Sequence, residues 1–135
     1  MSEYGIAVTL PLDFAVAVER TRAALAEQGF GVLTEIDVAA TMKAKLDADL
    51  PPYLILGACN PPLAHRAITT EASIGLLLPC NVVVRALEDG QTLVEAMDPQ
   101  VMAKVTDAPE LAEVAAEAEA RLRAALATLQ IGAGR

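Results

Sequence analysis

The chain has 135 residues, of which 54% are hydrophobic but only 3% are aromatic, and its formal net charge is −8. This length is typical of one domain, so we predict a single domain over residues 1–135 with a core built mainly from Ala, Val and Leu. The negative charge and the scattered Lys and Arg residues disfavour binding to nucleic acid or to anionic membranes, because both require clustered basic side chains.

The sequence also bears on where the protein works. Residues 1–4 show neither the basic region nor the apolar stretch of a signal peptide. No apolar run approaches the roughly 20 residues that a bilayer span requires. We therefore expect a cytoplasmic protein, in which two cysteines are more often free thiols, ligands or packed apolar groups than a structural disulfide.

The first half of the chain alternates strand and helix patterns. Alternating or continuous apolar runs predict strands, which cover residues 4–10, 31–37 and 53–59. Helical spacing and capping residues predict helices, which run from Asp13 to Gly29, over residues 38–46, and from Asn60 to about Thr70.

The second half contains a hairpin followed by helices. Strands are predicted at 80–87 and 92–97, joined by the turn 88–91, and Arg85 is expected to pair with Glu95 across them. Two helical segments follow: a short one at 101–105 and a long one that begins near 107–110. Residues 131–135 are expected to form a frayed tail. These elements predict an α+β domain with a mixed five-stranded sheet and helices mainly on one face.

The favourable charge spacing of the long helix predicts two ion pairs. Glu117 and Arg121, and likewise Glu119 and Arg123, are four residues apart, so their side chains lie one turn apart on the helix surface.

The candidate site lies at the end of the predicted strand 53–59 and at the start of the next predicted strand, 80–87. Cys59 ends a buried strand, directly before the helix that Asn60 caps, and Cys80 begins the next strand, directly before Asn81. The dipole at a helix amino terminus stabilises a thiolate, which is a physical reason to expect ligation or reactivity at Cys59. His65, the only histidine, lies about one turn into the same helix.

The orientation of the two strands decides whether the cysteines meet. Antiparallel neighbours would bring the end of one strand, Cys59, beside the start of the other, Cys80. Parallel neighbours would separate the sulfurs by about 20 Å and exclude a shared metal or a disulfide. The sequence leaves both arrangements open. It offers no obvious fourth ligand for zinc and no recognised catalytic signature, which favours a binding protein over an enzyme.

Two segments resemble a known family. The stretch 56–67, Leu-Gly-Ala-Cys-Asn-Pro-Pro-Leu-Ala-His-Arg-Ala, and the stretch 74–84, Ile-Gly-Leu-Leu-Leu-Pro-Cys-Asn-Val-Val-Val, resemble the paired motifs of domain of unknown function family number 302. The segments 29–38 and 97–99 resemble further parts of that family. The resemblance implies a small α+β fold, often dimeric, and places both cysteines within the family pattern. It implies no established activity.

Three functional hypotheses follow. The leading one is a homodimeric binding protein for a small molecule or a soft transition metal, with Cys59, Asn60, His65, Cys80 and Asn81 around the ligand. For a metal, the expected ligands are Cys59, His65 and Cys80, since thiolate and imidazole suit copper or zinc. The second is a thiol-dependent redox enzyme or sensor with Cys59 as nucleophile and Cys80 as resolving thiol. The third is a purely structural assembly module.

Overall fold

The computed structural model describes residues 2–133. Its elements are β1 (Gly5–Leu10), α1 (Phe14–Glu27), β2 (Gly31–Asp37), α2 (Val38–Leu46), β3 (Tyr53–Cys59), α3 (Pro61–Thr70), the 3-10 helix η1 (Ala72–Leu77), β4 (Cys80–Ala86), β5 (Thr92–Met97), α4 (Gln100–Val105) and α5 (Pro109–Ala133). Each strand and helix expected from the sequence is present, and η1 is an additional element in the connector between α3 and β4.

The five strands form one sheet in the order β1-β5-β4-β3-β2. The prediction of an α+β domain with five strands is confirmed, but every pair of neighbours is antiparallel, so the sheet is not mixed. The reason lies after β3, where α3 leads the chain away from the sheet and η1 returns it to the end that it left. β4 therefore starts beside the end of β3.

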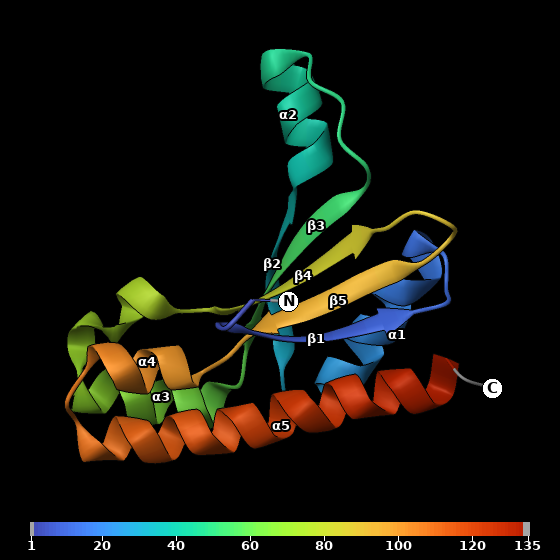
Figure 1. The fold of residues 1–135 in the computed structure, drawn as a ribbon. Coiled ribbons are helices and arrows are strands. Elements are labelled where there is room, and N and C mark those ends of the chain that lie inside the picture. The colour runs from blue at the N-terminus through green and yellow to red at the C-terminus, as the bar shows by residue number, and fades with distance from the viewer. Residues whose placement is uncertain (1, 134–135) are drawn as a thin grey trace.

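Figure 1 shows α1, α3, α4 and α5 together on one side of the sheet. Strand residues that alternate onto this side are apolar and buried, among them Leu56, Val82 and Val94, all with no exposed surface. They pack with α1 and with one half of α5, where Leu122 is also fully buried. We refer to this side as the covered face of the sheet and to the other side as the open face.

A second, smaller core lies beyond the end of the sheet. Leu63 of α3, Ile74 of η1, Met102 of α4 and Leu111 of α5 are buried there together. Because α5 extends along both cores, it joins them (Figure 1).

The segment from Ile36 to Leu50, which we call the arm, differs from the rest of the fold. It comprises the end of β2, helix α2 and the turn to β3, and it projects away from α5 (Figure 1). Helix α2 has no buried residue. Its ends are nevertheless well defined: Asp37 Oδ1 accepts a hydrogen bond from Ala40 N at 2.8 Å, and Asp47 closes the helix in the left-handed conformation.

Two details of the second half differ from expectation. Arg85 lies opposite Leu93, and Glu95 lies opposite Val83, so the expected Arg85–Glu95 pair is not formed. Glu95 instead accepts a hydrogen bond from Ser2 Oγ at 2.8 Å. The expected frayed tail is also wrong for residues 131–133, which continue α5, while residues 134 and 135 lie outside the described range.

The two ion pairs expected along α5 are confirmed. Arg121 Nε lies 3.4 Å from Glu117 Oε2, and Arg123 Nε lies 2.8 Å from Glu119 Oε2. Among residues 2–133, no helix combines the length and the apolar character that crossing a bilayer requires.

Candidate functional site

The antiparallel pairing of β3 and β4 resolves the question that the sequence left open. Cys80 lies directly opposite Ala58, so it is a near neighbour of Cys59, which follows Ala58 at the end of β3. Both cysteines are free thiols and both are partly buried. The arrangement that would place them at opposite ends of the sheet does not occur.

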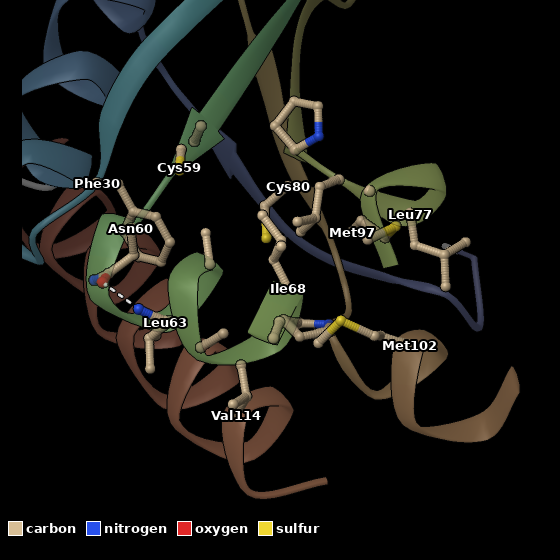
Figure 2. Close-up of a pocket in the computed structure, with 18 of the residues that line it drawn as sticks. Phe30, Cys59, Asn60, Leu63, Ile68, Leu77, Cys80, Met97, Met102 and Val114 are labelled. Carbon is tan, nitrogen blue, oxygen red and sulfur yellow. Dashed lines mark hydrogen bonds between the residues drawn. The ribbon is translucent and has the colours of Figure 1, made fainter. Parts of the chain in front are cut away.

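Asn60 turns the chain from β3 into α3. Its Oδ1 accepts a hydrogen bond from Leu63 N at 3.4 Å, drawn as a dashed line in Figure 2, and its Nδ2 donates to Gln28 O at 3.4 Å. Arg121 Nη1 of α5 donates to the same carbonyl at 3.1 Å. The amide of Asn60 therefore fixes the start of α3 against the end of α1, while Pro61 needs no donor partner at the first helical position.

A cavity of about 350 Å³ lies between this end of the sheet and the helices. The ends of strands β2, β3, β4 and β5 contribute to its wall, together with Phe30 before β2, helix α3, η1 and its connection to β4, and helices α4 and α5. Its wall is almost wholly apolar and includes Phe30, Leu63, Ile68, Leu77 and Val114 (Figure 2).

Four sulfur-bearing side chains contribute to the same cavity. They are Cys59 from the end of β3, Cys80 from the start of β4, Met97 from the end of β5 and Met102 from α4. Figure 2 shows them distributed around the space. Thiols and thioethers are soft, polarizable groups that pack well against apolar and aromatic molecules.

Burial changes the acid strength of one thiol. Loss of water around Cys80, with a smaller contribution from the nearby Cys59, raises the pKa of the Cys80 thiol to about 11. At neutral pH this side chain is therefore a protonated, neutral thiol.

The structure brings three of the five expected site residues together. Cys59, Asn60 and Cys80 line the cavity, whereas His65 is exposed on α3 and Asn81 is exposed opposite Gly57. The side of α3 that faces the cavity and the second core carries Leu63, Ala64 and Ala67. His65 is exposed on another side of the helix and is therefore absent from the cavity wall. Sequence spacing alone did not specify which side of α3 packs inward.

The expected metal ligands do not converge as a set of three. Within the described range 2–133, no group of three or more His, Cys, Asp and Glu side chains is arranged to hold a metal ion.

Most of the cavity wall was not identified from the sequence. Phe30, Met97 and Met102 come from segments that lie far from the cysteines along the chain. Leu63 and Ala67, four residues apart on α3, carried a usable signal, because that spacing places both on one side of a helix. The contribution of α4 and α5 depends on tertiary packing.

The protein-family model described as "Domain of unknown function DUF302" matches residues 6–129 of the chain. The chain belongs to the DUF302 family. The resemblance carried by segments 56–67 and 74–84 is thereby confirmed.

A solved DUF302 structure is similar throughout. It is the crystal structure of an uncharacterized conserved protein DUF302 from Bacillus stearothermophilus, with a TM-score of 0.86 and 31% sequence identity, covering 95% of this chain and 99% of that chain. No match was found among curated proteins. Family membership therefore supports the fold of this DUF302 chain.

Proposed function

We propose that this DUF302 domain binds a small, largely apolar molecule in the cavity beside Cys59 and Cys80. The observation that carries the proposal is the cavity itself, about 350 Å³ in volume with an almost wholly apolar wall. Ligand sites typically begin at about 300 Å³ and combine apolar walls with a few polar groups.

The polar groups of the cavity favour a neutral ligand. The Asn60 amide is already engaged with Leu63 N and Gln28 O, and the Cys80 thiol is protonated at neutral pH. A charged ligand would lose its hydration without gaining a partner of opposite charge, which costs several kcal/mol or more. An apolar ligand gains from the same surroundings.

A thiophilic metal ion, for example Cu(I), is a second candidate. It is favoured by the four sulfur-bearing side chains, Cys59, Cys80, Met97 and Met102, that line one cavity. Such a site would not use His65, and the metal would have to displace the Cys80 proton.

The redox alternative is less favoured, because a resolving thiol must react as thiolate and the raised pKa of Cys80 suppresses that form.

A fluorescence titration with the apolar probe N-phenyl-1-naphthylamine tests the proposal. The chain contains no Trp, so protein emission interferes little with the probe. Ala64→Phe fills the cavity from its wall, and His65→Phe places the same ring at the adjacent exposed position. We expect Ala64→Phe to weaken probe binding by about tenfold or more, since burial of the probe is lost, and His65→Phe to leave it unchanged.

The outcomes separate the candidates. Equal probe binding by the two variants, or none by the native protein, would contradict an apolar ligand in this cavity. A titration with Cu(I) under reducing conditions addresses the second candidate: stoichiometric binding that Cys59→Ser and Met102→Leu both weaken would support it, and binding insensitive to both variants would contradict it.

A further inference from the structure

The opening of the cavity is formed by those wall residues that are exposed to solvent. They are Leu33 and Thr34 of β2, Ile68 of α3 and Gly75 of η1. Two of them are large apolar side chains: Leu33 is 68% exposed and Ile68 46%, and Ile68 lies on α3 beside the space drawn in Figure 2. Single exposed apolar side chains are common on protein surfaces, but these two converge from different elements on one opening.

An irregularity of strand β2 sets the position of Leu33. Val32 lies opposite Ala58 of β3. Thr34 lies opposite the adjacent Gly57, so Leu33 is an extra residue without a partner in the pairing. Such a bulge bends its strand and re-directs a side chain, and bulges are over-represented next to active sites. Leu33 therefore reaches the opening through a deviation from regular strand pairing.

The opening is uncharged, although the chain as a whole has a formal charge of −8. Among the residues that the structure describes, no charged side chain lines the cavity. On β2, Glu35 pairs with Arg22. On α3, Arg66 Nη2 lies 3.5 Å from Glu113 Oε2, and Glu71 lines a separate hollow beside η1. A charged group at the opening would lose hydration without gaining a partner, which favours an uncharged ligand.

The cavity is small for a ligand site. Its volume of about 350 Å³ is near the lower end of the range of roughly 300–1,000 Å³ that such sites occupy. Because its inner polar groups are engaged or protonated, the apolar end of a ligand enters first and the polar end remains at the opening. A compound longer than the cavity then leaves it across Leu33 and Ile68 and covers their exposed surface.

From this geometry we infer that the ligand is an elongated, uncharged compound with a linear hydrocarbon chain longer than the cavity, such as a long-chain alcohol or ester. The inner part of the chain fills the cavity, and the part that follows packs on Leu33 and Ile68. This inference rests on the proposed function, since it specifies the ligand class of the same cavity.

Displacement of N-phenyl-1-naphthylamine by 1-hexanol, 1-octanol, 1-decanol and 1-dodecanol, corrected for the affinity of each variant for the probe, tests the inference. Leu33→Ser removes apolar surface from the opening, and Leu46→Ser makes the same change at an equally exposed Leu of α2, 70% against 68%, outside the cavity wall. In the native protein and in Leu46→Ser, each added methylene should strengthen binding by up to about fourfold. Leu33→Ser should bind 1-hexanol as the native protein does and 1-dodecanol about fivefold or more weakly, because only the longer chain reaches residue 33.

Leu33→Met supplies the conservative control. It keeps an apolar side chain at the opening, so it should bind 1-dodecanol within about twofold of the native protein. Sedimentation velocity of the native protein and Leu33→Ser should show the same association state. A change of association state in Leu33→Ser would overturn the inference, because a second copy of the chain would then cover Leu33.

The remaining outcomes separate this inference from the proposed function. If no alcohol displaces the probe, the cavity does not bind apolar chains and the proposed function fails. If 1-hexanol binds but longer alcohols bind no more tightly to the native protein, the cavity remains a binding site and only the inference is overturned. A loss in Leu33→Ser that is equal for all four alcohols would also overturn it, because Leu33 would then shape the cavity without contacting the part of the chain outside it.

Discussion

Helices α5 and α2 show how differently two helices of one small chain are stabilised. α5 has 25 residues, eight of which are buried, and it contacts both cores of the molecule. α2 has nine residues, none of them buried, although both of its ends are capped. Capping and backbone hydrogen bonds therefore define where a helix begins and ends, while burial supplies most of its stability.

The same difference separates the two ends of the sheet. At the cavity end, β3 leads into α3 and η1 leads into β4, and α3 and η1 form a small apolar core with α4 and α5. At the arm end, helix α2 connects β2 to β3, and none of its residues is buried. One end encloses a cavity within the chain, and the other exposes apolar side chains such as Leu46.

The largest expected effect contrasts a core leucine with an arm leucine. Leu122 of α5 is fully buried, so Leu122→Ala should lower the free energy of unfolding by about 2–5 kcal/mol. Leu46→Ala should change it by less than about 0.5 kcal/mol when the chain is monomeric, since Leu46 is already exposed. Urea denaturation of dilute protein measures both. Similar losses for the two variants would mean that the arm is part of the hydrophobic core of the chain.

A pH titration of stability gives an intermediate effect at the cavity end. The pKa of Cys80 is raised to about 11 in the folded protein, against an ordinary value of 9.0. Below pH 9 the thiol is protonated in both states, and its contribution is fully present. As the pH rises from about 9 to 11, the unfolded chain releases the proton and the folded chain retains it, so stability falls by about 2 kcal/mol.

Cys80→Ala is the control for that titration, because other groups also ionise above pH 9. The difference in unfolding free energy between the native protein and Cys80→Ala should decrease over this interval and become constant above it. A constant difference between pH 8 and 12 would show that burial does not hold the Cys80 proton.

The smallest expected effect compares two helix caps. Asn60 caps α3 inside the body, so Asn60→Ala should lower the global unfolding free energy by about 1 kcal/mol. Asp37 caps α2 on the arm, so Asp37→Ala should speed hydrogen exchange of residues 38–46 and leave global unfolding of dilute protein unchanged. Equal global losses would contradict the distinction between arm and body.

Local sequence signals predicted most elements of the fold. The capping residues Asp13 and Asn60 occupy the positions expected of them, and the apolar run of β3 forms a central strand. The signals failed where a prediction required knowledge of register. Arg85 and Glu95 seemed matched across the hairpin, but the turn length sets a register in which each faces an apolar residue.

The candidate site was predicted only in part, for a related reason. Cys59, Asn60 and Cys80 were identified because they flank element boundaries that the sequence reveals. His65 was included from its proximity along the chain, and Met97 and Met102 were missed because nothing local connects them to β3. Which side of a helix faces inward depends on the elements it meets.

The sequence by itself determined the elements, the caps and the DUF302 membership, because these depend on short-range periodicity and on motifs of a few residues. Tertiary structure alone decided that β3 and β4 are antiparallel, that the two cysteines share a cavity with two methionines, and that the arm remains uncovered. Those features arise from contacts between residues far apart along the chain, and no local pattern encodes which distant surfaces will meet.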